Sequence, residues 1–205
     1  MKVLIVVDVQ YDFLPGGALA VPEGDRVIPV INSLMDRFDK IIATQDWHPA
    51  GHGSFAASHE GKKPGDRIDL DGLPQILWPV HCVQETRGAE FSGSLRTEKF
   101  DKVFRKGTDV NIDSYSGFYD NGHRKSTGLS DFIRELEPES VYITGLATDY
   151  CVKFTALDSI KEGFRTLVVS DAVRAVNLTT GDDEKALEEM RDAGVTVITS
   201  DKILA

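Results

Sequence analysis

The chain reads KVLIVVDV over residues 2–9, directly after the first methionine. A short, valine-rich apolar run of this kind is typical of a β-strand that is buried on both faces. Such strands belong to parallel sheets, because the crossover connections of these sheets place helices over both faces. We therefore expect an α/β protein that begins with a buried strand.

Strands and helices are expected to alternate along the rest of the chain. Apolar residues spaced three and four positions apart predict helices, and short apolar runs predict strands. The expected strands are 2–9, 40–44, 101–105, 140–145, 166–170 and 195–199, and the expected helices are 27–38, 130–136, 149–162 and 182–193. Ser130 or its neighbour is the expected cap of the second helix. This order predicts one domain, residues 1–205, with a doubly wound, mostly parallel six-stranded sheet and helices on both faces. Residues 48–76 and 107–126 are expected to be long irregular loops.

The composition is that of an ordinary globular protein. The 205 residues are 41% hydrophobic and 27% charged, which excludes disordered, collagen-like and coiled-coil proteins. The net charge of −10 makes a nucleic-acid or anionic-membrane partner unexpected. We find no signal-peptide core and no apolar run of roughly 20 residues. Two cysteines cannot form a disulfide framework, and we expect a cytoplasmic protein.

Four reactive side chains are expected at the ends of successive strands. Ligands of doubly wound sheets bind beyond the carboxyl ends of the strands. The residues expected there are Asp8, Asp46, Lys106 and Cys151. Because two carboxylates, an amine and a thiol coincide at this edge, we expect the active site there.

Cys151 is the candidate nucleophile. It follows a strand that ends at Gly145, and Thr148 is the expected cap of the next helix. In the first turn of that helix, the free N–H groups and the helix dipole favour a thiolate and can hold a developing oxyanion. Lys106 would stabilise the thiolate, and Asp8 would carry its proton. The alternative from position alone is a buried, inert thiol.

A second cluster suits a transition-metal ion. In an extended chain, Asp46 and His48 face the same side and can bind one ion together. His52 follows after a short turn, and His81 lies further along the chain. Carboxylate and imidazole ligands favour zinc, iron(II) or manganese over calcium. The alternative is a polar loop with solvated histidines. The two remaining histidines are expected at the surface: His59 and His123.

The motifs of dinucleotide dehydrogenases, P-loop NTPases, serine hydrolases with a GxSxG elbow and HExxH metalloproteases are absent. The motifs that are present resemble, in order, those of the nicotinamidases (pyrazinamidases) among the isochorismatase-like cysteine hydrolases. The segments that carry the resemblance are Asp8–Phe13, Asp46–Pro49 with His52 and later His81, Phe104–Gly107 and Gly145–Val152.

The resemblance implies the isochorismatase-like hydrolase fold and conversion of nicotinamide to nicotinate and ammonia, in NAD salvage. Cys151 would attack the carboxamide and form a thioester, while Asp8 moves the proton and Lys106 holds both groups electrostatically. The N–H groups of Ala147 and Cys151 would form the oxyanion hole, beside a cis peptide bond between Leu146 and Ala147.

The resemblance also implies one divalent metal ion, with zinc favoured over iron or manganese. Asp46, His48 and His81 would bind it, and the ion would orient the pyridine ring and carry water. His52 is a fourth ligand in some relatives and stays open. The nicotinamide substrate is the implied partner, and the residues leave the existence of a homo-oligomer open.

Three aromatic residues are implied as the walls of the substrate slot: Phe13, Trp78 and Tyr115. For each of them the alternative is ordinary core packing. Cys82, beside His81, is interpreted as a packed thiol. The stretch 109–113 departs from the shortest relatives, which leaves the slot-lining residues within 107–126 open.

Two other functions compete with this one. A sister amidase acting on another small carboxamide or ureido substrate would keep Asp8, Lys106 and Cys151 and would not need the metal ligands. A binding or metal-carrying protein without turnover would explain the histidines, but not a lysine and a cysteine at neighbouring strand ends.

Overall fold

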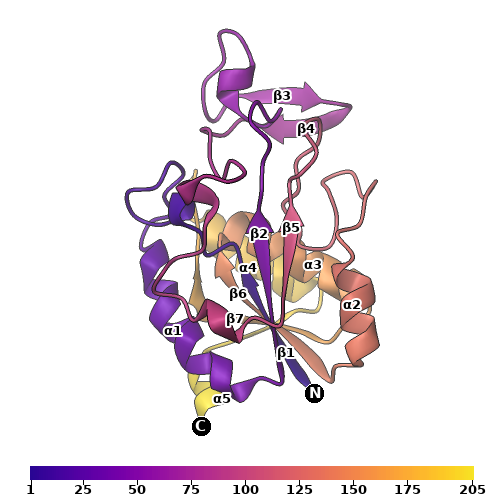
Figure 1. The fold of residues 1–205 in the computed structure, drawn as a ribbon. Coiled ribbons are helices and arrows are strands. Elements are labelled where there is room, and N and C mark those ends of the chain that lie inside the picture. The colour runs from indigo at the N-terminus through magenta and orange to yellow at the C-terminus, as the bar shows by residue number, and fades with distance from the viewer.

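A computed structural model describes all residues from 1 to 205, and its centre is a parallel sheet of six strands (Figure 1). The strand order is β5-β2-β1-β6-β7-β8, and every neighbouring pair is parallel. The strands are β1 (Lys2–Val7), β2 (Lys40–Asp46), β5 (Lys102–Lys106), β6 (Ser140–Leu146), β7 (Thr166–Arg174) and β8 (Thr196–Ile198). The predicted doubly wound α/β fold is confirmed.

Helices cover both faces of this sheet. They are α1 (Val27–Leu34), α2 (Leu129–Leu136), α3 (Lys153–Lys161), α4 (Asp182–Asp192) and α5 (Asp201–Leu204). A hydrophobic core lies on each face of the sheet, and alternate residues of β1 contribute to one or the other. Leu4 and Val6 pack in the core that contains α1, whereas Val3, Ile5 and Val7 pack in the core that contains α2, α3 and α4. This two-sided burial is why β1 is apolar from Val3 to Val7.

Several boundaries differ from the sequence prediction. β1 stops at Val7, because Asp8 adopts a left-handed backbone with φ of 48° and turns the chain out of the ladder. The helix expected over 27–38 is α1 followed by a 3₁₀ turn. The expected cap Ser130 is wrong, since Gly128 occupies the cap position and the Ser130 hydroxyl donates to Glu162.

The long loop expected over 48–76 contains a hairpin that the sequence analysis missed. It consists of β3 (Arg67–Leu70) and β4 (Leu73–Ile76), paired antiparallel. Asp71 and Gly72 connect the strands with φ of 50° and 82°, the positive values that a type I′ turn requires. The hairpin rises above the carboxyl ends of β2 and β5 in Figure 1, so it overhangs the edge where the reactive residues were expected. The short helix α5 was also missed.

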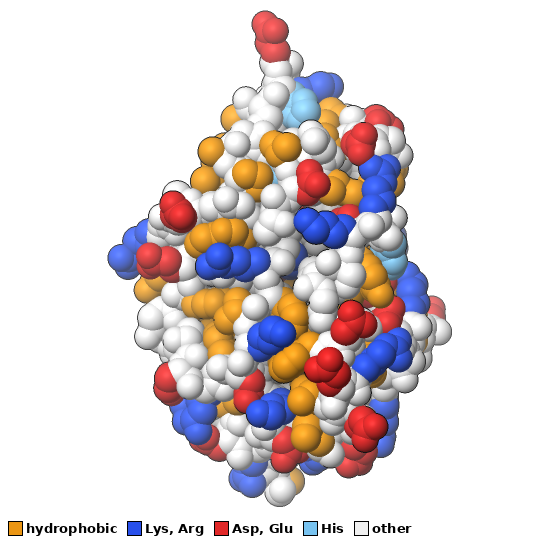
Figure 2. Space-filling view, turned by 45° about the vertical axis from the view of Figure 1, so that its right-hand side comes forward, with side chains coloured by type: hydrophobic (Ala, Val, Ile, Leu, Met, Phe, Trp, Pro, Cys, Tyr) orange, Lys and Arg blue, Asp and Glu red, His pale blue; other side chains and the backbone are white.

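Basic and acidic side chains are interspersed over the face shown in Figure 2. No helix of the structure combines the length and the apolar character needed to cross a bilayer.

Glu162 follows α3 and ties three segments together. Its carboxylate accepts hydrogen bonds from the Ser130 hydroxyl and from the Tyr119 hydroxyl, the latter at 2.7 Å. Arg134 of α2 forms an ion pair with it at 2.7 Å. The hydrogen bond from Ser130, reinforced by those from Tyr119 and Arg134, holds the pKa of Glu162 below its ordinary value.

We predict that Glu162→Gln lowers the free energy of unfolding at neutral pH by about 1 kcal/mol, since bonds to a charged group are lost at a partly exposed site. A carboxyl with a depressed pKa stabilises the fold above its unfolded pKa and loses that effect on protonation. The difference from wild type should therefore shrink as the pH falls through and below 4.5. Urea unfolding over a pH series measures it. Glu188→Gln, on an exposed position of α4, is the control, and a pH-independent difference would contradict the prediction.

Candidate functional site

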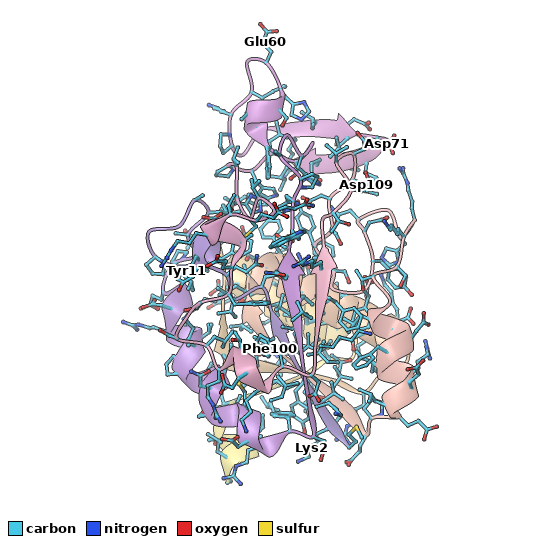
Figure 3. The ribbon with its side chains drawn as sticks, in the orientation of Figure 1. Lys2, Tyr11, Glu60, Asp71, Phe100 and Asp109 are labelled. Carbon is cyan, nitrogen blue, oxygen red and sulfur yellow. The ribbon has the colours of Figure 1, made fainter.

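The reactive residues of four neighbouring strands meet at the carboxyl edge of the sheet. Asp46 and Lys106 are the last residues of β2 and β5 and pair with each other in register. Asp8 directly follows β1, and Cys151 follows β6 after one short turn. Figure 3 shows nitrogen and oxygen atoms gathered above the ends of β2 and β5. The structure thus brings together the four residues that the sequence placed at strand ends.

The ammonium group of Lys106 is the hub of this cluster. Its Nζ lies 2.8 Å from Oδ2 of Asp8, 2.5 Å from Oδ1 of Asp46 and 3.3 Å from Sγ of Cys151. It also donates to the backbone carbonyl of Ser114 at 2.9 Å. Burial acts to lower the pKa of Lys106, but the charges of Asp46 and Asp8 outweigh it and raise this pKa well above its ordinary value. Lys106 is therefore charged although its side chain is fully buried.

Asp8 is oriented as a proton acceptor. Its Oδ1 accepts a hydrogen bond from the Thr44 hydroxyl at 2.6 Å. Its Oδ2 is ion-paired with Lys106, yet receives no hydrogen bond of good geometry. Burial raises the pKa of Asp8, although Lys106 acts in the opposite direction. Acceptor atoms of Asp8 and Asp46 lie within 4.8 Å of Cys151 Sγ, so Asp8 can take the thiol proton with little movement.

The setting of Cys151 differs from the expected one. The residue lies in a π-helical turn, Thr148–Val152, and α3 starts only at Lys153. Ala147 and not Thr148 occupies the cap position of this turn, so the expected cap is wrong. Burial raises the pKa of the Cys151 thiol well above its ordinary value, and Asp8 and Asp46 add to this effect while Lys106 opposes it. The expectation of a resting thiolate is therefore wrong: the site holds a thiol beside a base.

The backbone before Cys151 offers a donor for an oxyanion. The Leu146–Ala147 peptide bond is cis, as the resemblance implied. The Ala147 carbonyl accepts bonds from the N–H groups of Tyr150 and Val152, at 3.1 and 3.0 Å. The Ala147 N–H itself donates to no protein acceptor, and Ala147 and Cys151 both line the same small cavity.

The three expected metal ligands converge beside the hub. Oδ2 of Asp46 lies 3.4 Å from Nε2 of His48 and 3.7 Å from Nε2 of His81. The other ring nitrogens are engaged with backbone carbonyls: Nδ1 of His48 with Gly107 at 2.9 Å, and Nδ1 of His81 with Pro79 at 2.8 Å. Protons on Nδ1 leave both Nε2 lone pairs facing the Asp46 carboxylate.

This donor set fits a divalent metal ion of the zinc type. Carbonyl groups that fix the tautomer of ligand histidines are a regular feature of metal sites. Burial acts to raise the pKa of Asp46, but Lys106 and His48 outweigh it and hold this pKa well below its ordinary value. Asp46 is thus anionic, and it uses one oxygen for Lys106 and directs the other toward the histidines.

His52 lies next to this cluster but is occupied by protein contacts. Its Nδ1 accepts the N–H of Ser54 at 3.2 Å, and its Nε2 lies 3.3 Å from the carbonyl of Ile112. These contacts engage both ring nitrogens, and the ring also lies with His48 and Asp113 in a second group of side chains whose ligand atoms are within 4.8 Å of one another. Of the histidines expected at the surface, His123 is exposed, whereas His59 is half-buried and bonds to the Gly53 carbonyl at 2.7 Å. Cys82 is fully buried, and burial raises the pKa of its thiol well above the ordinary value.

A narrow slot leads to Cys151. The three aromatic residues expected as its walls all line it: Phe13, Trp78 and Tyr115. Sequence reasoning missed Tyr150 and Asp113, which also line it. Tyr150 packs edge-on against Trp78 with ring centroids 4.9 Å apart. Its position directly before the nucleophile was an available signal, whereas nothing in the sequence marked Asp113.

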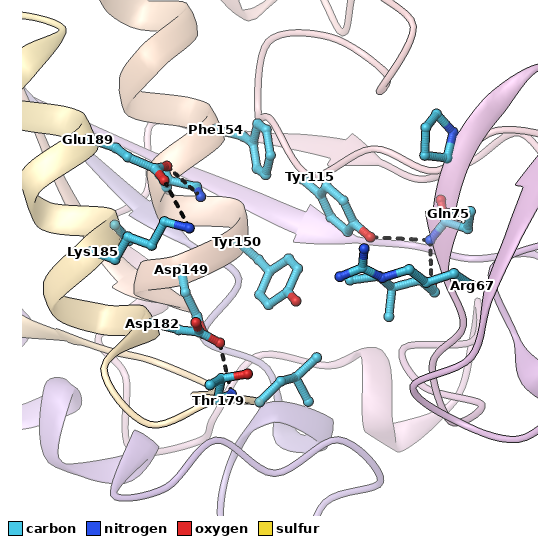
Figure 4. Close-up of a pocket in the computed structure, with 15 residues that line it drawn as sticks. Arg67, Gln75, Tyr115, Asp149, Tyr150, Phe154, Thr179, Asp182, Lys185 and Glu189 are labelled. Carbon is cyan, nitrogen blue, oxygen red and sulfur yellow. Dashed lines mark hydrogen bonds and ion pairs between the residues drawn. The ribbon is translucent and has the colours of Figure 1, made fainter.

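The slot holds about 30 Å³, space for only a few water molecules. A larger cavity of about 430 Å³ adjoins it and shares Tyr115 and Tyr150 with it (Figure 4). The larger cavity contains no member of the hub or the metal cluster, and its Lys153 and Glu189 pair with each other at 2.9 Å. Reactive residues therefore line the slot and not the outer cavity.

Comparison with known proteins agrees with this geometry. Residues 2–202 match the family model described as the isochorismatase domain. A nicotinamidase of Escherichia coli K12 is 48% identical over 97% of this chain and 94% of its own length.

Two solved structures share the whole architecture. An Acinetobacter baumanii nicotinamidase/pyrazinamidase has a TM-score of 0.95 at 46% identity, covering 98% of this chain and 97% of that one. A pyrazinamidase of Pyrococcus horikoshii in complex with zinc has a TM-score of 0.79 at 40% identity, covering 97% and 98%. With matches that extend along nearly its full length, this chain belongs to the isochorismatase family.

Proposed function

We propose that this protein is an amidohydrolase that converts nicotinamide to nicotinate and ammonia through a thioester on Cys151. The observation that carries the proposal is the Lys106 ammonium group, which contacts the base, the nucleophile and a metal ligand at once. The E. coli relative that is 48% identical over nearly the whole chain is a nicotinamidase, which supports the same substrate.

The first half-reaction forms the thioester. Sγ of Cys151 attacks the carboxamide carbon as Asp8 takes the thiol proton. The oxygen of the carboxamide gains negative charge, which the N–H groups of Ala147 and Cys151 would stabilise. Asp8 then gives its proton to the leaving nitrogen, the C–N bond breaks, and ammonia departs.

The second half-reaction hydrolyses the thioester. Asp8 takes a proton from water as the water oxygen attacks the same carbon. The C–S bond breaks, Asp8 returns the proton to Cys151, and the carboxylic acid product loses its own proton to water and leaves as nicotinate. Lys106 keeps its charge throughout, and it stabilises whichever of Asp8 and Cys151 is anionic at each stage.

Asp46, His48 and His81 would hold a divalent ion, for which we propose zinc, in line with the zinc complex of the Pyrococcus horikoshii pyrazinamidase. Such an ion would supply a Lewis acid for a pyridine nitrogen, beside the slot that Asp46 and His81 line. Phe13, Trp78, Tyr115 and Tyr150 would flank the aromatic ring.

We predict that Cys151→Ala lowers the rate of ammonia release from nicotinamide by at least about a thousandfold, because no other group can form the thioester. Cys82→Ala is the control and should keep most of the activity, since that thiol lines no cavity of the site. Ammonia release from nicotinamide measures both. Full activity of Cys151→Ala would contradict the mechanism.

We predict that Gly107→Ala weakens zinc binding by about tenfold or more. Gly107 has φ of 63°, and an added Cβ would lie 2.4 Å from Cε1 of His48. Gly163→Ala is the matched control: its φ is 87°, but its Cβ would meet nothing within 4 Å. Both variants carry backbone strain of about 1 kcal/mol, and only Gly107→Ala displaces a ligand.

Zinc affinity is measured by competition with a chromophoric chelator, and nicotinamide hydrolysis is followed in the same samples. Equal affinities for the two variants would argue against His48 as a ligand. Full hydrolysis of nicotinamide by protein stripped of metal would contradict the role proposed for the ion, because it would show that Asp8, Lys106 and Cys151 are sufficient.

A further inference from the structure

Two polar side chains in the segment after β1 have no part in the mechanism described above. Gln10 is fully buried, and Asp12 is half-buried two residues further on. Neither reaches the hub formed by Lys106. Both bond to the backbone beside a proposed metal ligand, and these bonds suggest what the two side chains do.

Gln10 clamps the peptide groups of Asp46. Its Nε2 donates to the Asp46 carbonyl at 2.8 Å, and its Oε1 accepts the Asp46 N–H at 2.8 Å. The same Nε2 also donates to the carbonyl of Ala89 at 2.9 Å. All three bonds are buried, so none can be replaced by solvent at low cost.

The need for this clamp follows from the end of β1. The ladder between β1 and β2 stops at the pair Val7 and Thr44, because the chain turns away at Asp8. Asp46 therefore extends beyond the strand that would have bonded to it. A buried N–H and a buried carbonyl need partners, and the primary amide of Gln10 has the donor and acceptor of a peptide group. Gln10 thus continues the ladder by one step.

The clamp has consequences for the carboxylate. Asp46 must offer Oδ1 to Lys106 at 2.5 Å while Oδ2 faces the histidines at 3.4 and 3.7 Å. A carboxylate can serve both sides only if its backbone is held in one place. Gln10 provides that restraint on the side of the strand away from β5.

Asp12 restrains the opposite side of the metal cluster. Its Oδ2 accepts the N–H of Cys82, the residue after His81, at 2.7 Å. Cys82 has φ of 45°, a left-handed conformation that costs energy for a residue with a side chain. Asp12 also accepts the Ala18 N–H at 3.2 Å. The bond to Cys82 holds the turn that aims the His81 ring at Asp46.

We propose that Gln10 and Asp12 are positioning residues of the metal site: Gln10 fixes Asp46, and Asp12 fixes His81. One short segment, which starts with the base Asp8, then aligns the base and both sides of the metal cluster. This inference rests on the proposed function, since it takes Asp46 and His81 as ligands.

Gln10→Met tests the first half, with Gln45→Met as a matched control. Gln45 is also buried, and its Nε2 donates to the same Ala89 carbonyl at 2.9 Å, but its side chain does not bond to Asp46. We expect the zinc dissociation constant to rise about 10- to 100-fold in Gln10→Met and less than about twofold in Gln45→Met. Chelator competition gives the constants, and thermal unfolding of the metal-free proteins shows whether the two losses of stability are comparable.

Gln10→Glu is the second variant in case Gln10→Met does not fold. It keeps the size of the side chain and the acceptor for the Asp46 N–H, but it loses both donated bonds, and we again expect at least about tenfold weaker zinc binding.

Asp12→Ala and Asp12→Asn test the second half. Alanine removes the acceptor for the Cys82 N–H, and we expect about tenfold weaker zinc binding. Asparagine keeps an acceptor oxygen and should restore the affinity to within about threefold of wild type. If Asp12 had only a structural role, Asp12→Ala would lower the unfolding temperature, and Asp12→Asn would not restore the zinc affinity.

If wild type binds zinc and the two variants Gln10→Met and Gln45→Met bind it with equal affinity, the inference for Gln10 is overturned. The proposed function is then still intact. Matching affinities of wild type and Asp12→Ala would do the same for Asp12. A wild-type protein that neither binds zinc nor hydrolyses nicotinamide would overturn the proposed function and this inference together.

Discussion

The site depends on one buried cation shared by three acidic groups. The Asp8 and Asp46 carboxylates and the Cys151 thiol all contact the ammonium of Lys106 within 3.3 Å. Without it, two carboxylates would be packed together in a region of low dielectric, and removing one partner of a buried ion pair typically costs about 3–5 kcal/mol. Lys106 therefore links the proposed chemistry of the nucleophile to that of the metal.

The parallel sheet brings these four groups together. Its order places Lys106 of β5, Asp46 of β2, Asp8 after β1 and Cys151 after β6 on successive strands. All these strands point the same way, so their last residues lie along one edge. Each strand therefore contributes one group, and the loops above that edge add the proposed histidine ligands and the aromatic walls.

The protonation of the thiol decides how the chemistry starts. Full burial outweighs the stabilising charge of Lys106 and raises the pKa of the Cys151 thiol, so the proposed mechanism uses Asp8 to take the thiol proton. The π-helical turn holds that thiol at the slot and delays the start of α3 until Lys153. Preparing the site is thus a matter of placing the thiol and the base together, rather than of storing a thiolate.

The sequence by itself determined where the six strands of the sheet follow one another along the chain, because apolar runs such as residues 2–9 reflect burial directly. It also marked Asp8, Asp46, Lys106 and Cys151 by their place at strand ends. Tertiary structure alone decided the rest. The clamp from Gln10 to Asp46 spans 36 residues and the bond from Asp12 to Cys82 spans 70, and no local pattern encodes contacts at such separations. The charge state of Cys151 likewise follows from burial and from neighbours on other strands, which only the folded chain brings together.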